Sequence, residues 1–213
     1  GGDISMLDGS TIPKASSWAA RTGAFNWYQY YYSVLAYGAT TGEKFLSGQQ
    51  SAYIETSTDA VAWTKRTHGN TGNNSYWRDA SFLNNNFHLL GYNGAYSIST
   101  DAIHWTMRTT GTTQELWDFD YDGSTNYMFV GKNGVCSVST DTIHWKLRTT
   151  SFATTWTISC KYASSQWLIG SQYGKLATST DTINWDRRTL GATTSVNIYN
   201  FNYHDAANKY LAF

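Results

Sequence analysis

Apolar and polar residues alternate along most of the chain in short runs that turn residues separate. Residues 117–121 alternate, residues 122–126 have the composition of a turn, and residues 127–130 are apolar. A second turn at 131–134 leads into another alternating run at 135–138. Runs of period two bounded by Gly, Asn and Asp predict β-hairpins. No stretch sustains a helical period of 3.6 residues, so we predict an all-β chain with essentially no helix.

The strand pattern repeats along the chain. Four segments align without gaps: STDAVAWTKRT from Ser57, STDAIHWTMRT from Ser99, STDTIHWKLRT from Ser139 and STDTINWDRRT from Ser179. A fifth, degenerate copy, WAART, covers residues 18–22. A period of about 40 to 45 residues is typical of propeller blades with four short strands. The repeat therefore predicts a five-bladed β-propeller.

The predicted propeller is a single domain over residues 1–213. Residues 208–213 match the second strand of a unit, and residues 1–7 match the glycine turn and third strand that should follow it. We therefore expect the last blade to be shared by residues 1–22 and about 190–213, with strands from both termini closing the ring. Closure removes exposed sheet edges. The rim motifs lie near 18–22, 57–67, 99–109, 139–149 and 179–189.

The aspartate and tryptophan of each repeat are assigned to structure. The aspartate can accept backbone N–H bonds within its own turn, and the tryptophan four residues later can pack across that turn. The pairs are Asp59 and Trp63, Asp101 and Trp105, Asp141 and Trp145, and Asp181 and Trp185. An arginine three residues after each tryptophan is expected to tie down the same corner; these are Arg21, Arg66, Arg108, Arg148 and Arg188.

The motif Ser-x-Asp-x-x-x-Trp resembles the Asp-box, or bacterial neuraminidase repeat. It is most similar to a shortened form, Ser-Thr-Asp-Gly-x-x-Trp-x-x-Arg-Thr, which is abundant in phage tail and other virion proteins and in bacterial surface proteins. The resemblance implies a turn on the blade rim, between the third and fourth strands. The chain departs from this pattern where the glycine is expected, at Ala60, Ala102, Thr142 and Thr182.

Charge and composition exclude several classes of function. The 15 Lys and Arg residues balance the 15 Asp and Glu residues, and only 14% of the chain is charged. A nucleic-acid-binding protein would show a basic stripe, and a membrane-spanning helix needs an apolar run of at least about 18 residues. Cys136 and Cys160 are too few for a disulfide framework and lack metal-ligand spacing. We expect no nucleic-acid partner, no membrane insertion, no metal and no cofactor.

Candidate catalytic residues are sparse. The chain has three glutamates, and the rim motif leaves only Arg78 and Arg187 as additional arginines. We therefore predict no catalytic residues and no enzyme. Asp118, Asp120 and Asp122 could offer neighbouring carboxylates, but strand alternation puts all three on one face and Asp122 begins a turn. A glycoside hydrolase-like enzyme on the same scaffold is the second alternative, because a dispersed pair among the 15 acidic residues could still supply the two carboxylates. The histidines show no spacing for a metal site or a triad; they are His68, His88, His104, His144 and His204.

Aromatic residues make up 16% of the chain, with 10 Trp. Half of the tryptophans belong to the rim motif, and three of the others recur where the innermost strand of the next blade should begin. They would either pack between blades or form a platform for sugar rings at one mouth of the propeller. The candidate ligand-binding residues are Trp27, Tyr28, Trp77, Trp117, Trp156 and Tyr199.

These features favour a non-enzymatic recognition or structural module. We expect a bacteriophage tail, baseplate or capsid-decorating propeller whose partners are other virion proteins or cell-surface glycans. We expect it to be located in the virion or the extracellular space, and to form a homo-oligomer as part of a larger assembly. The first alternative is a free-standing carbohydrate-binding lectin, since five-bladed lectins of the tachylectin type carry one site per blade.

Overall fold

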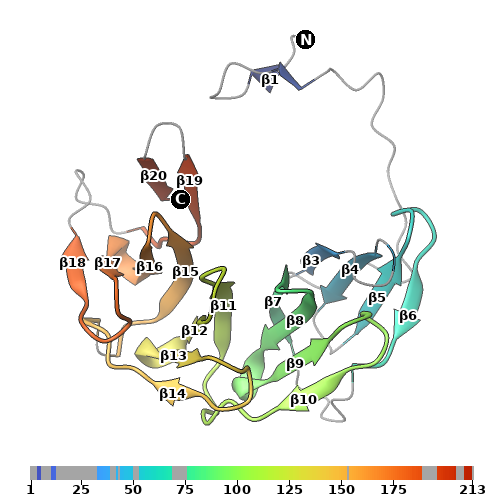
Figure 1. The fold of residues 1–213 in the computed structure, drawn as a ribbon, viewed down its shortest axis with the longest axis horizontal. Coiled ribbons are helices and arrows are strands. Elements are labelled where there is room, and N and C mark those ends of the chain that lie inside the picture. Colours follow the sequence, from blue (N-terminus) through green and yellow to red (C-terminus); the bar gives the residue numbers. More distant parts are fainter. Residues whose placement is uncertain are drawn as a thin grey trace.

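The structure, a computed structural model, describes residues 4–5, 11–12, 33–38, 42, 44–49, 53–68, 76–152, 154–188, 196–204 and 209–212. Four antiparallel four-stranded sheets follow one another along the chain and form the blades of an arc (Figure 1). Each blade runs in chain order from the centre of the arc to its rim. The prediction of an all-β fold is confirmed.

The strands pair within each blade in sequence order. The first blade contains β3 (Ser33–Gly38), β4 (Lys44–Gln49), β5 (Ile54–Ser57) and β6 (Thr64–Arg66). The second blade contains β7 (Trp77–Leu83), β8 (Asn86–Gly91), β9 (Tyr96–Ser99) and β10 (Thr106–Arg108). The third blade contains β11 (Leu116–Tyr121), β12 (Tyr127–Gly131), β13 (Cys136–Ser139) and β14 (Lys146–Leu147). The fourth blade contains β15 (Thr157–Ala163), β16 (Gln166–Ser171), β17 (Leu176–Ser179) and β18 (Asp186–Arg188).

Short 3-10 turns join the second and third strands of three blades. They are η3 (Tyr92–Gly94), η4 (Lys132–Gly134) and η5 (Gln172–Gly174). The first residue of each turn donates its N–H to the carbonyl of the residue directly before an inner strand. The N–H of Lys132, for example, donates to the carbonyl of Glu115 at 2.8 Å. The turns and the beginnings of the inner strands therefore lie at the same mouth of the arc. Among the described residues, no helix is long and apolar enough to cross a membrane.

A β-bulge near the start of the inner strand recurs in three blades. The pairing register shifts between Trp77 and Asp79, between Leu116 and Asp118, and between Thr157 and Ser159. The shift makes Asp79, Asp118 and Ser159 equivalent positions. Because bulges re-aim side chains, this one sets which residues face the centre of the arc.

Apolar side chains between neighbouring blades form the core. Trp77 is fully buried between the first and second blades, Phe129 between the second and third, and Trp167 between the third and fourth. Burying one such side chain stabilises the fold by about 1.5–3 kcal/mol. Cys136 and Cys160 are free thiols in the last of these clusters.

The two ends of the chain form separate two-stranded sheets. β1 (Ile4–Ser5) pairs with β2 (Thr11–Ile12), and β19 (Phe201–His204) pairs with β20 (Lys209–Ala212). β1 lies apart from the arc in Figure 1, and neither sheet has four strands. A fifth blade built from both termini and closure of the ring are thus not confirmed. The degenerate motif at 18–22 lies outside the described residues.

Candidate functional site

Each rim motif folds into a turn held by its serine and aspartate. The Ser139 hydroxyl donates to Asp141 Oδ1 at 3.0 Å, and the same oxygen accepts the N–H groups of Ile143 and His144, both at 2.8 Å. The other three turns repeat these bonds. The His144 side chain and these N–H groups hold the pKa of Asp141 below its ordinary value. The aspartates are therefore engaged within their own turns.

Some of the remaining rim residues bond to the same corner, whereas four rim nitrogens are buried without a hydrogen-bond partner in the described part of the chain: Arg108 Nε, Arg148 Nε, Trp145 Nε1 and Trp185 Nε1. Trp105 Nε1 donates to the carbonyl of Ala102 at 3.1 Å, and Arg188 Nε donates to Thr178 Oγ1 at 2.9 Å. His144 Nδ1 lies 2.7 Å from Asp141 Oδ2. His104 and Asn184 make the same contact in their turns, so these two histidine positions support the turn, a contact that the sequence motif alone did not predict.

The predicted aromatic ring does not consist of equivalent residues. Trp77 occupies the bulge position and is fully buried, whereas Trp117 follows that position and Trp156 precedes it. A shift of one residue along a strand turns a side chain to the other face. Trp117 and Trp156 meet with ring centroids 5.9 Å apart, and Tyr199 is 62% exposed. Trp27 and Tyr28 lie outside the described residues.

Cations stack on the two meeting tryptophans. The Arg78 guanidinium lies 4.5 Å from the centroid of Trp117, and Lys132 Nζ lies 4.8 Å from that of Trp156. Arg78 also forms a buried ion pair with Glu115. Contacts of this kind contribute about 0.5–2 kcal/mol each. They join the second, third and fourth blades, which favours packing between blades as the role of Trp117 and Trp156.

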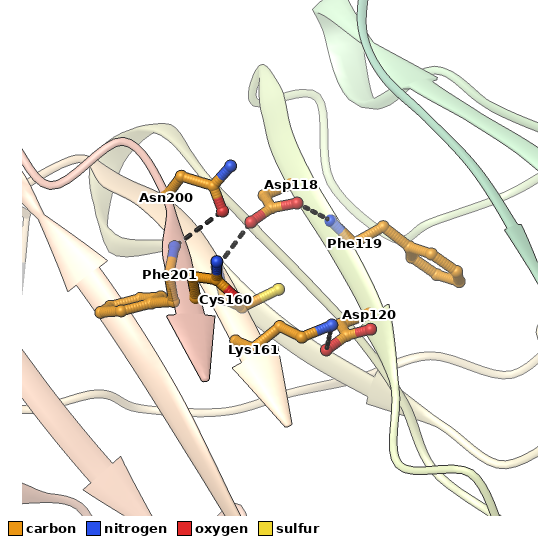
Figure 2. Close-up of a pocket in the computed structure, with 8 residues that line it drawn as sticks. Asp118, Phe119, Asp120, Cys160, Lys161, Asn200 and Phe201 are labelled. Carbon is orange, nitrogen blue, oxygen red and sulfur yellow. Dashed lines mark hydrogen bonds and ion pairs between the residues drawn. The ribbon is translucent and has the colours of Figure 1, made fainter. Parts of the chain in front are cut away.

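A cavity of about 440 Å³ opens where the inner strands β11, β15 and β19 approach one another, and we call it the channel pocket (Figure 2). It is lined by two carboxylates, two amides, an ammonium group, a thiol and two phenyl residues. These are Asp118, Asp120, Asn200, Asn202, Lys161, Cys160, Phe119 and Phe201.

The two carboxylates of the channel pocket bridge neighbouring blades. Asp118 accepts the N–H groups of Phe119 and Cys160, both at 2.8 Å, and Asp120 Oδ2 accepts that of Tyr162 at 2.7 Å. β15 is the edge strand of its sheet, so among the described residues the N–H groups of Cys160 and Tyr162 have no strand partner on that side. Carboxylates from β11 satisfy them instead. The strand alternation that places Asp118 and Asp120 on one side is as predicted.

The same position of the last sheet holds an amide. Asn200 Oδ1 accepts the N–H of Phe201 at 2.7 Å, as Asp118 accepts that of Phe119 (Figure 2). Asn200 is therefore the counterpart of Asp118, and Tyr199 is the counterpart of Trp117. Sequence reasoning missed Asn200, Asn202 and Lys161 as pocket residues. The available signal was their spacing in the repeat, since residues 118 and 200 are nearly two periods apart.

Two buried carboxyl groups of the inner strands have raised pKa values, because burial favours their protonated forms. Burial raises the pKa of Asp79 to about 7, and burial together with the charge of Asp79 raises the pKa of Asp118. Lys161 is the only cation among the described residues that line the channel pocket, and its Nζ lies 3.2 Å from Asp120 Oδ2. Within the described ranges, no three His, Cys, Asp or Glu side chains are grouped as they would be around a metal ion.

Comparisons with known proteins identify the architecture. No family model and no curated protein matches the chain. Virginiamycin B lyase from Staphylococcus aureus is similar in structure, with a TM-score of 0.69, 8% identity, and coverage of 84% of this chain and 69% of that one. YCF48 bound to D1 peptide has a TM-score of 0.59 and 14% identity, and the match covers 78% of this chain and 55% of YCF48. A protein of unknown function from Bacteroides caccae also has a TM-score of 0.59, at 9% identity, covering 80% of this chain and 66% of that one.

These likenesses confirm a propeller-like fold and correct one prediction. The chain was expected not to be an enzyme because it lacks a recognisable catalytic cluster. That prediction is wrong, because virginiamycin B lyase, a protein of similar fold, is an enzyme. At 8% identity the likeness shows the fold alone and assigns no activity to this chain. The resemblance to Asp-box proteins stays a prediction.

Proposed function

We propose that the chain is a recognition propeller of a bacteriophage virion that binds glycan in its channel pocket. The observation that carries this proposal is the pocket's lining, which combines hydrogen-bond acceptors and donors around about 440 Å³. Ligand pockets commonly have volumes of about 300–1,000 Å³ with a few convergent polar groups. A monosaccharide unit is a ligand of suitable size and polarity for such a pocket.

Sugar hydroxyls both donate and accept hydrogen bonds, and the pocket offers partners for both. Asp118 and Asp120 supply carboxylate oxygens, whose several lone pairs can accept further bonds beyond the backbone N–H groups. Asn200 uses its carbonyl oxygen for Phe201 and retains an NH₂ group that can donate.

Ligand binding is compatible with this architecture. Virginiamycin B lyase with a His-to-Ala change has been solved with quinupristin, and YCF48 with a D1 peptide. Both likenesses are below 25% identity, so they support ligand binding by the fold without indicating the ligand. The virion assignment rests on the resemblance of the repeat to phage tail and virion proteins and on the neutral charge balance.

The proposed recognition module is a closed ring of five blades. The support is the uncovered face of β3, where Leu35 is 66% and Tyr37 48% exposed, and Leu211 of β20, which is 42% exposed. A fifth blade made of β19, β20 and the N-terminal strands would cover these side chains. The sequence register, in which residues 1–7 continue the repeat after residue 213, favours the same arrangement.

Glycan-array screening followed by calorimetry tests the binding function. We expect binding of at least one glycan, with a loss of about tenfold in affinity when Asn202→Ala removes a lining amide. Thr149→Ala, an exposed substitution outside the pocket, is the matched control and should change nothing. An array without hits, or equal affinities for the two variants, contradicts the proposal.

Mass spectrometry of purified phage particles tests the virion assignment. The chain should be present in particles made by the phage that encodes it. Its absence from such particles, combined with glycan binding that Asn202→Ala weakens, would replace the virion component by a free-standing lectin.

A further inference from the structure

Two carboxyl groups and one ammonium group are among the described residues that line the channel pocket, so carboxyl groups outnumber cations there. Asp118 and Asp120 both line the cavity, and Asp79 occupies the position of Asp118 one blade earlier. Burial and the charge of Asp79 both raise the pKa of Asp118. Lys161 supplies the single positive charge among the described residues that line the cavity.

Lys161 shows how an ammonium group is accepted in this pocket. Its Nζ reaches Asp120 Oδ2 at 3.2 Å from the neighbouring blade (Figure 2). The Asp120 side chain is only 7% exposed, whereas that of Lys161 is 41% exposed. The carboxylate is therefore fixed in the wall, and its cationic partner sits on a flexible stem at the solvent side. Such a partner can move away or be replaced by a second ammonium group.

A further carboxyl group lies on the inner strand β7, at the position that Asp118 occupies one blade later. Asp79 Oδ2 is a buried oxygen that receives no hydrogen bond from the described part of the chain. A buried carboxylate oxygen without a donor is costly, and a nearby cation is the group that relieves this cost most effectively. A positive charge bound near Asp118 would favour the ionised form of that carboxyl group, which burial and the charge of Asp79 disfavour.

We propose that the channel pocket selects amino sugars with a free ammonium group over neutral and N-acetylated sugars. This inference rests on the proposed glycan-binding function and specifies its ligand class. The ammonium group binds at Asp120 in place of Lys161 or beside it, and the ring hydroxyls bond to the asparagine amides and Asp118. An N-acetyl group carries no charge, so it makes no ion pair in the same position.

Calorimetry with a matched pair of oligosaccharides tests the ligand class. The probes are oligomers of glucosamine and the same oligomers fully N-acetylated. At about 50 mM NaCl the glucosamine oligomer should bind about tenfold more tightly, and this advantage should shrink at about 500 mM NaCl because salt screens the ion pair. Equal affinity for the two probes at low salt overturns the inference.

Two substitutions should change the affinity for glucosamine oligomers in opposite directions. Asp120→Asn keeps an oxygen that can accept the Tyr162 N–H but loses the charge, and it should weaken binding about tenfold. Lys161→Met removes the internal competitor and should strengthen binding severalfold. Lys146→Met, on the exposed outer strand β14, is the control and should leave the affinity unchanged. Near-UV circular dichroism verifies that each variant is folded.

The sign of the Lys161→Met effect separates this inference from the general glycan proposal. If Lys161→Met weakens binding and the N-acetylated oligomer binds as well as its partner, the preference for amino sugars is wrong while glycan recognition stands. If no glycan of any class binds, both are wrong. A lysine-containing peptide that binds in an Asp120-dependent manner, where no sugar does, also overturns both and leaves a peptide site.

Discussion

At the scale of single residues, the rim turns show how a repeated motif tolerates an unfavourable backbone. The residue after each rim aspartate has a positive φ, 55° at Ala60, 58° at Ala102, 62° at Thr142 and 63° at Thr182. Residues with a Cβ pay a free-energy cost there, and the cost is largest for β-branched ones. The serine and aspartate bonds hold the turn despite this cost. The glycine expected from the Asp-box resemblance would fit the same turn without it.

Ala60→Gly should therefore stabilise the fold. We expect the free energy of unfolding to rise by about 0.5–1 kcal/mol, because relief of the left-handed backbone outweighs the added entropy of the unfolded chain. Urea denaturation measures the change. Ala62→Gly, two residues later in the same turn and not among the residues of positive φ, is the control and should destabilise by a similar amount. Destabilisation by both substitutions would show that the turn carries no such strain.

Asp79 gives the fold a pH dependence of known sign. Its pKa in the folded state, about 7, lies above the ordinary value of 3.8, so the folded chain binds more protons than the unfolded chain between these two pH values. Stability from this group is therefore present at low pH and is lost as the pH rises from about 4 to about 7.

Asp79→Asn removes the titrating group and should flatten this loss. Relative to the parent chain, the variant should gain about 1–3 kcal/mol of unfolding free energy between about pH 5 and about pH 8. Asp186→Asn, whose parent side chain is 80% exposed, serves as the control. A gain that is equal at both pH values would show that Asp79 is already ionised at the lower one.

At the scale of elements, the inner strands determine both the stability of the arc and the position of its pocket. Asp118 accepts the N–H of Phe119 on its own strand, β11, and the N–H of Cys160 on β15, and the second bond connects the two strands. Asp118→Ala leaves these donors without an acceptor and should destabilise the fold by about 1–3 kcal/mol. Asp118→Asn, which keeps an oxygen acceptor, should lose less, as measured by urea denaturation. Equal losses would indicate that the carboxylate charge, rather than its bonds, holds the strands together.

The sequence predicted where the strands lie, but not the exact register in which they pair. The apolar run at 127–130 and the turn at 131–134 appear as β12 and η4. The bulge at Leu116 and Asp118 was not predictable, because one extra residue depends on how the partner strand pairs. Relative to this bulge, Trp77 is equivalent to Leu116 and Trp117 lies one residue later, so Trp77 is fully buried and Trp117 is half-buried. Lys161 and Asn200 carry no local motif, and only the packing of separate blades brings them to one pocket.

At the scale of the whole molecule, the central question is how the ring is completed. Deletion of residues 1–12 tests whether the N-terminal strands are part of a fifth blade. If they cover Leu35 and Tyr37, the deletion should lower Tm by about 5 °C or more, because 1 kcal/mol corresponds to about 2–4 °C for a domain of this size. Replacement of residues 1–12 by a Gly/Ser segment of equal length should have the same effect. An unchanged Tm in both variants would contradict a fifth blade that contains the N-terminal strands.

The most direct test of glycan recognition is a crystal structure of the chain with a bound glucosamine oligomer. We predict a sugar ring in the channel pocket, with its ammonium group at Asp120 and hydroxyls at Asn200 and Asn202. A sugar bound only at the rim turns or only over Trp117 and Trp156, with the channel pocket empty at saturating ligand, would contradict the account.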